Sequence, residues 1–156
     1  MIGILDYGMG NLRSVSNAIE HIGYDAVLIS EPRSFRSSIS HLILPGVGSY
    51  ARAMQNLKES GLQAVIREHV RAGRPFLGIC LGMQLLSSKG YEHGETPGLG
   101  IIEGEAVPLN IGDGYLIPHM GWNTVALSNS HPVFERVKNY IDFYFVHTFY
   151  DPLRVI

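Results

Sequence analysis

Apolar positions in the first 90 residues alternate between two spacings. Short continuous apolar runs are typical of buried strands, and stripes at three- and four-residue spacing are typical of amphipathic helices. Strands are therefore predicted at Ile2–Leu5, Ala26–Ile29, 42–44 and 75–79. Helices are predicted from Leu12 to Ile22, from a Ser49 cap to about Lys58, along the stripe 62–70, and from Leu81 to about Ser88. This alternation predicts an α/β fold with a largely parallel sheet and helices on both faces.

The pattern changes after Gly90. Residues 94–104 hold four glycines and a proline and read as a loop. Strand patterns then follow at short intervals, at 105–109, 115–119, 123–127 and 142–148. Strands so close together predict an antiparallel extension of the main sheet. Because no repeat, low-complexity tract or clear linker divides the chain, we expect a single domain over residues 1–156.

Composition and charge exclude several classes of protein. Hydrophobic residues make up 46% and charged residues 17% of the chain, which is typical of a compact globular protein. A formal net charge of −2 gives no reason to expect a nucleic-acid partner or an anionic membrane surface. A lone cysteine excludes an internal disulfide, and no run approaches the ~20 apolar residues of a membrane span. We expect a cytosolic protein.

The only cysteine, Cys80, lies in the sequence Gly78-Ile79-Cys80-Leu81-Gly82, between an apolar strand pattern and a helix pattern. This is the cysteine counterpart of the Gly-x-Ser-x-Gly nucleophile elbow, in which a sharp strand-to-helix turn exposes the reactive atom. A helix N-terminus beneath the sulfur would favour the thiolate. The alternative is a buried structural cysteine, the ordinary place of a free Cys. The bracketing glycines favour the nucleophile.

A cysteine nucleophile needs N–H donors for the oxyanion that it creates. The backbone N–H of Leu81 is one candidate, and the segment Gly46-Val47-Gly48 after the third strand is another. An ordinary strand-to-helix turn explains the second segment equally well.

The glycine loop at residues 6–11 is a weak dinucleotide site, since Arg13 occupies the place of the third glycine in G-x-G-x-x-G.

Seven histidines are candidates for the acid–base partner of Cys80. His119 and His147 are the most interesting, because both lie in strand patterns of the second half. Histidines in such positions are more often structural than catalytic. No pair has HExxH or other metal-ligand spacing, so neither a metal site nor a cofactor is expected.

Five segments together resemble the class I glutamine amidotransferases. They are residues 6–12, 44–48, 78–84, 118–123 and 145–148, and the likeness runs from Met1 to about Tyr150. The first and fourth segments are most similar to the branch that docks to a cyclase subunit in histidine biosynthesis. The resemblance implies a flavodoxin-like fold and a glutaminase that passes ammonia to this cyclase. A paralogue that feeds ammonia to a nucleotide-sugar amidation partner stays an alternative.

The resemblance also implies roles for individual residues. Cys80 would attack the side-chain amide of glutamine, with Val47, Gly48 and Leu81 around the oxyanion. The α-groups of glutamine would be held by Gln84, Thr148 and Phe149. The face toward the cyclase would carry Asn11, Met120 and Trp122. For Trp122, a place in the core is the alternative.

The sequence departs from this family at its end, since no His-x-Glu, the family's general base and its partner, stands near the C-terminus. Three interpretations follow: a chain without its C-terminal segment, a shortened homologue that binds the cyclase without hydrolysing glutamine, or another cysteine hydrolase that uses His119 or His147. The order of the motifs counts against the third. The apolar run 144–149 favours the first, because such a strand expects neighbours on both sides. As written, the chain is expected to hydrolyse glutamine very slowly.

Overall fold

The computed structural model describes residues 1–110, 112, 116–128 and 130–152. It divides into two compact units, which are described separately below. The first comprises Met1–Pro108 and the chain from Tyr150 onward, and the second comprises Leu109–Phe149. The single domain over residues 1–156 stays a prediction. None of the helices in the described ranges is long and apolar enough to cross a membrane.

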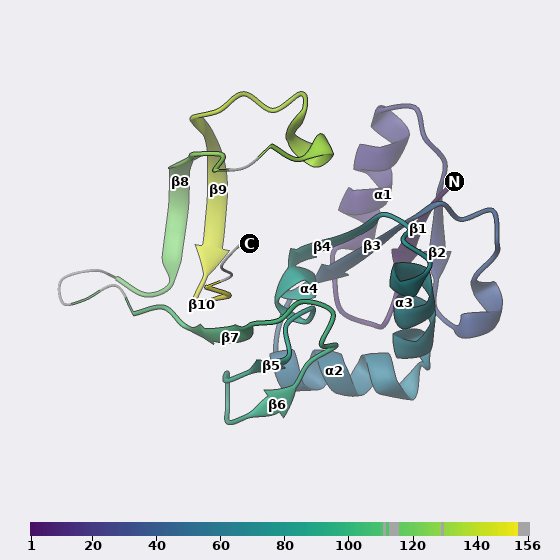
Figure 1. Cartoon of the computed structure of the whole chain (residues 1–156), viewed down its shortest axis with the longest axis horizontal. Helices are drawn as coiled ribbons and strands as arrows, with labels where there is room; N and C mark the ends of the chain where they lie inside the picture. Colours follow the sequence, from purple (N-terminus) through teal and green to yellow (C-terminus); the bar gives the residue numbers. More distant parts are fainter. Residues whose placement is uncertain (111, 113–115, 129, 153–156) are drawn as a thin grey trace. The chain divides into compact units, whose positions relative to one another are not determined.

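The first unit is built on a parallel sheet of four strands, in the order β2-β1-β3-β4 (Figure 1). Its strands are β1 (Ile2–Leu5), β2 (Ala26–Ile29), β3 (His41–Gly46) and β4 (Phe76–Cys80). The predicted parallel sheet is therefore confirmed. In the register of β3 and β4, Gly46 lies opposite Cys80, so the carboxyl ends of these two strands meet at one edge. Functional groups on parallel sheets gather at this edge.

Helices cover both faces of this sheet, as predicted (Figure 1). They are α1 (Leu12–His21), α2 (Tyr50–Glu59) and α3 (Leu62–Arg71). Successive residues of a strand point to opposite faces of the sheet, so β1 contributes side chains to the packing on both faces. Leu5 belongs to one buried cluster with Leu57 of α2 and Ile66 of α3. Ile4 points the other way, toward the side of the sheet that α1 packs against.

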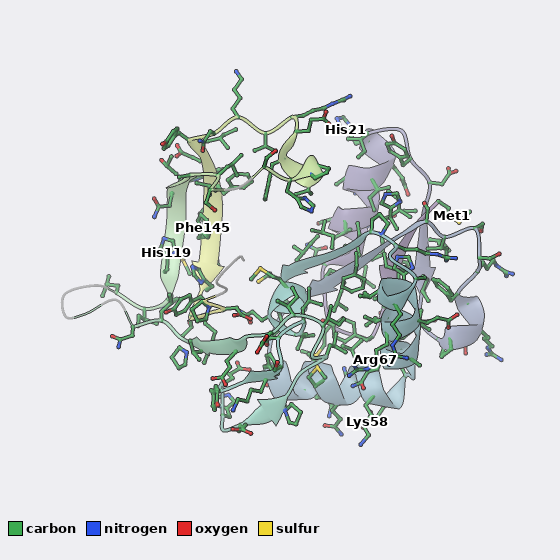
Figure 2. All side chains as sticks on the ribbon, in the orientation of Figure 1. Met1, His21, Lys58, Arg67, His119 and Phe145 are labelled. Carbon is green, nitrogen blue, oxygen red and sulfur yellow. The ribbon has the colours of Figure 1, made fainter. Side chains whose placement is uncertain are left out.

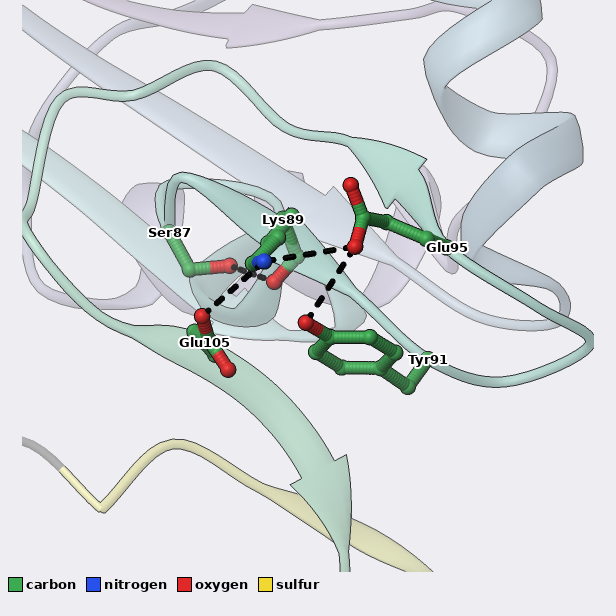
Figure 3. A network of polar contacts seen from close by, with 5 residues as sticks. All are labelled: Ser87, Lys89, Tyr91, Glu95 and Glu105. Carbon is green, nitrogen blue, oxygen red and sulfur yellow. Dashed lines mark hydrogen bonds and ion pairs between the residues drawn. The ribbon is translucent and has the colours of Figure 1, made fainter.

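Short strands form a second sheet in the order β10-β7-β5-β6. They are β5 (Lys89–Gly90), β6 (Thr96–Pro97), β7 (Glu105–Pro108) and β10 (Phe149–Tyr150). The expected antiparallel extension of the main sheet is wrong, because the described strands after Gly90 pair in sheets of their own. Polar contacts hold this sheet together: the Lys89 ammonium lies 3.2 Å from carboxylate oxygens of both Glu95 and Glu105 (Figure 3).

The second unit is a hairpin of β8 (His119–Val125) and β9 (Ile141–His147) in antiparallel register. The separate strands expected at 115–119 and 123–127 are wrong, since β8 runs through the gap between them; Tyr115 lies outside the described residues. Gly121 lies within β8, directly opposite Phe145. Its neighbour Trp122 packs edge-on against Tyr144, with ring centroids 5.6 Å apart. Such cross-strand aromatic pairs compensate for a glycine in a strand.

A buried histidine in α3 gives the first unit a pH-dependent stability. His69 is 1% exposed, and its Nε2–H donates to the carbonyl of Pro75 at 3.0 Å. Its Nδ1 is buried with no partner among the described residues. Burial lowers the pKa of His69, helped by the positive charge of Arg74. The folded protein therefore resists a proton that the unfolded chain accepts below pH about 6.5.

We predict that His69 makes the protein lose stability as the pH falls below about 6.5, with a limit of about 1.4 kcal/mol per pH unit for this one group. Above that pH, His69 is neutral in both states and has no such effect. Urea unfolding at pH 7.5 and 5.5 measures the difference. His69→Leu should lose less stability over this interval than the wild type, and the exposed control His93→Gln should match the wild type. Equal losses in His69→Leu and the wild type would refute the prediction.

Candidate active site

Cys80 lies at a sharp turn between β4 and the short helix α4 (Leu81–Gln84). Its backbone has φ 55° and ψ −120°, a conformation that residues with a Cβ adopt at a cost of about 1–3 kcal/mol. The side chain is exposed at the carboxyl edge of the sheet. The predicted strand–turn–helix elbow with a strained backbone is therefore confirmed. The structure excludes the buried structural cysteine that was the alternative.

The two glycines around Cys80 serve close packing rather than the turn itself. Neither Gly78 nor Gly82 has a positive φ; the strained residue is Cys80. A Cβ on Gly78 would lie 2.6 Å from the Met83 Cα, and a Cβ on Gly82 would overlap the carbonyl oxygen of Leu44. The elbow therefore packs backbone against backbone on β3. This contact holds the cysteine at a fixed place beside the end of that strand.

The helix after the elbow is shorter than the sequence predicts. We expected a helix to about Ser88, but α4 ends at Gln84. The chain then tightens: the N–H of Leu86 donates to the carbonyl of Met83, and the Ser87 hydroxyl donates to the carbonyl of Gln84 at 2.7 Å. Serine bonds of this kind compete with a continuing helix. A four-residue helix has a small macrodipole, and its help for the thiolate stays a prediction.

The candidate oxyanion residues lie at the same sheet edge as the sulfur. Val47 and Gly48 directly follow β3, whose last residue Gly46 is the register partner of Cys80. Gly48 has φ 97°, which a residue with a side chain rarely adopts. Leu81 is the first residue of α4 and is buried. The structure thus brings these residues and Cys80 together, and their oxyanion role stays a prediction.

Two residues that the sequence analysis missed anchor the segment around Val47. The Tyr7 hydroxyl donates to the carbonyl of Pro45 at 2.9 Å. Beyond the segment, the Tyr50 N–H donates to the Glu92 carboxylate at 2.5 Å. Glu92 thereby caps α2 in place of Ser49, whose side chain makes no capping bond, contrary to our expectation. The sequence could have indicated Tyr7, because it lies in a glycine loop after the first strand. No sequence pattern points to the capping role of Glu92.

The candidate interface residues are solvent-exposed. Trp122 is 73% exposed, so its alternative place in the core is excluded in this unit. Met120 lies two residues away on the same face of β8 and is 60% exposed. Asn11 is also exposed, and its side-chain oxygen accepts from the Ser14 N–H at 3.3 Å, which caps α1. Their contact with a partner stays a prediction.

His119 and His147 of the hairpin form a hydrogen bond with each other (Figure 2 labels His119). His119 Nδ1 lies 2.9 Å from His147 Nε2, and His147 Nδ1 lies 3.0 Å from the carbonyl of Phe149. Since that carbonyl only accepts, the His147 Nδ1 is the donor and its Nε2 accepts from His119. These contacts favour a structural role for both rings.

The remaining predicted residues are placed as follows. Gln84 closes α4, in the first unit with Cys80. Thr148 and Phe149 end the second unit, where the Thr148 carbonyl accepts from the Leu109 N–H at 2.8 Å. Their glutamine-binding roles stay predictions. Across the described part of the chain, no group of three or more His, Cys, Asp or Glu side chains is arranged to hold a metal ion.

Residues 3–152 match the family model for glutamine amidotransferase class-I. The chain is 49% identical over 146 residues to the imidazole glycerol phosphate synthase subunit HisH of Aquifex aeolicus, covering 94% of this chain and 70% of that protein. It is 47% identical over 150 residues to the HisH subunit of Caldanaerobacter subterraneus, covering 96% of this chain and 72% of that protein.

Solved structures show the same fold at low sequence identity. A crystal structure of a glutamine amidotransferase superposes with a TM-score of 0.71 at 19% identity, covering 93% of this chain and 70% of that one. The structure of PurLQS from Thermotoga maritima gives 0.70 at 20% identity, covering 95% of this chain and 66% of that one. These likenesses establish the α/β fold of the amidotransferase class.

Proposed function

Because the chain belongs to the class-I glutamine amidotransferase family, we propose that it is the glutaminase subunit of an imidazole glycerol phosphate synthase. The observation that carries this proposal is the exposed Cys80 on its strained elbow, at the end of the parallel sheet. The identity of nearly half the residues to HisH subunits, over almost the whole chain, favours this branch of the family.

In the proposed reaction, the Cys80 sulfur attacks the side-chain amide carbon of glutamine. The carbonyl oxygen becomes an oxyanion, which the N–H groups of Leu81 and of the Val47–Gly48 segment stabilise. The C–N bond then breaks, the nitrogen takes the proton that the thiol has lost and leaves as ammonia, and a γ-glutamyl thioester remains. Water hydrolyses this thioester to glutamate and restores the thiol. Gln84, Thr148 and Phe149 would hold the α-groups of the substrate.

The acceptor of the ammonia would be a cyclase subunit, bound as a heterodimer in the cytosol. The HisH relatives are named as subunits of a synthase, which supports such a partner. The side chains proposed to meet it are Asn11, Met120 and Trp122. Exposed tryptophan and methionine are common anchors of protein interfaces.

Transfer of the amide nitrogen tests the proposal. The protein and the cyclase, isolated together, receive glutamine labelled with ¹⁵N in the amide group and the phosphorylated substrate of the cyclase. We expect glutamate and a ¹⁵N-labelled cyclase product in equal amounts. A complex that forms unlabelled product from ammonium salt but none from glutamine would contradict the glutaminase role.

Trp122→Ala should weaken binding to the cyclase by about 2 kcal/mol or more, if the indole is an interface anchor. This corresponds to a roughly 30-fold higher Kd, in an interface on the order of 800 Å² per partner. Isothermal titration calorimetry measures the effect, with Tyr24→Ala as an exposed aromatic control. An unchanged Kd with a lowered melting temperature would mean that Trp122 serves only its own hairpin.

A further inference from the structure

Tyr7 is a buried tyrosine whose polar group points at the segment beside Cys80. It follows β1 at the carboxyl edge of the sheet and is only 4% exposed. Its hydroxyl donates to the carbonyl of Pro45 at 2.9 Å, and its own carbonyl accepts from the Asn56 side-chain amide at 3.0 Å. Tyr7 is therefore fixed at its side chain to β3 and at its backbone to α2.

The hydroxyl lies in the narrow space between β3 and the elbow. A Cβ on Gly46 would lie 2.6 Å from the Tyr7 hydroxyl oxygen and 2.7 Å from the backbone nitrogen of Gly82. Gly46 is also the register partner of Cys80. The hydroxyl thus contacts the strand end that faces the nucleophile, one residue before the Val47–Gly48 segment.

The hydrogen bond from the Tyr7 hydroxyl to Pro45 holds β3 at a point beyond the end of its pairing with β1. The register of β1 with β3 stops at Ile4 and Ile43, and Pro45 has no N–H of its own to donate. Burial, and then the charge of Cys80, raise the pKa of Tyr7. The phenol therefore keeps its proton, and its bond to Pro45, at neutral pH.

We propose that Tyr7 is a positioning residue for glutamine hydrolysis: its hydroxyl holds Pro45 and Gly46 so that the N–H groups of the following Val47–Gly48 segment meet the oxyanion formed at Cys80. This inference rests on the proposed function. An oxyanion donor displaced by about 1 Å loses much of its effect, whereas binding of the ground-state substrate changes little. Loss of the hydroxyl should therefore act on kcat and spare KM.

Tyr7→Phe, in the complex with the cyclase, tests this role, since it keeps the ring and removes the bond. We expect kcat for glutamine to fall by about 10- to 100-fold, with KM within about twofold of the wild type. Alkylation of Cys80 by iodoacetamide forms no oxyanion, so its rate against pH should stay at the wild-type values. Tyr24→Phe, which alters an exposed phenol, is the control and should match the wild type throughout.

Asn56→Ala is a milder second variant, for the case that Tyr7→Phe unfolds. It removes the donor to the Tyr7 carbonyl and should lower kcat several-fold, again without slowing alkylation. Unchanged kcat in a folded Tyr7→Phe, or equal losses of turnover and alkylation in either variant, would overturn the positioning role. A wild-type complex that does not hydrolyse glutamine would instead overturn the proposed function, so the two failures are distinct.

Discussion

Cys80→Ala is expected to lower glutamine-dependent turnover of the complex on the order of 10⁴-fold or more, because no other thiol in the chain can form the γ-glutamyl thioester. The strained backbone of Cys80 turns the chain sharply, and the side chain is exposed, so a substrate can reach the sulfur. Steady-state release of glutamate measures the loss. The fold should survive, since the exposed side chain fills no part of the core.

Added ammonium salt provides the control for Cys80→Ala. Ammonia bypasses the glutaminase step, so the cyclase reaction of the variant should reach the wild-type rate with ammonium and stay absent with glutamine. If Cys80→Ala kept a substantial part of its glutamine-dependent rate, another nucleophile would be responsible, and the assignment of Cys80 would be wrong.

Gly82→Ala should be among the most destabilising substitutions in the chain, at about 3 kcal/mol. Its Cβ would overlap the backbone carbonyl of Leu44, which cannot move aside as a flexible side chain could. The elbow must then separate from β3, so glutamine turnover should also fall. Urea unfolding measures the free energy, and alkylation of Cys80 reports on the elbow.

Gly73→Ala is a matched control for Gly82→Ala. A Cβ there meets nothing within 4 Å, and only the positive φ of 67° opposes it. This variant should lose about 1 kcal/mol, the cost of an alanine in the left-handed region. Equal losses in the two variants would show that the contact between the elbow and β3 is not tight.

The parallel sheet and the elbow could be predicted from sequence because each depends on local patterns. The strands β1 and β3 are largely buried, and all four strands from β1 to β4 are short continuous apolar runs, which is the local pattern of a parallel strand. The Gly78 to Gly82 motif likewise lies within five residues. The motif was identified correctly, but the structure gives its glycines a different physical role: the backbone strain lies at Cys80, and Gly78 and Gly82 permit close packing.

The supporting contacts of the site could not be predicted because they join distant residues. The Tyr7 hydroxyl bonds to a carbonyl 38 positions away, and Glu92 caps a helix 42 positions before it. Neither bond leaves a spacing that a pattern can detect. In the hairpin, the continuity of β8 between the two predicted strands depends on its pairing with β9, in which Gly121 lies opposite Phe145, and such pairing joins residues far apart in the sequence.

In the proposed reaction, everything depends on the attack of the Cys80 thiolate on the side-chain carbonyl of glutamine. The most direct measurement is peptide mass spectrometry of the protein after incubation with a glutamine analogue that carries a diazoketone in place of the amide. We predict a single adduct on the peptide that contains Cys80, formed more slowly when glutamine is present. An unmodified Cys80, or labelling that excess glutamine does not slow, would contradict the claim.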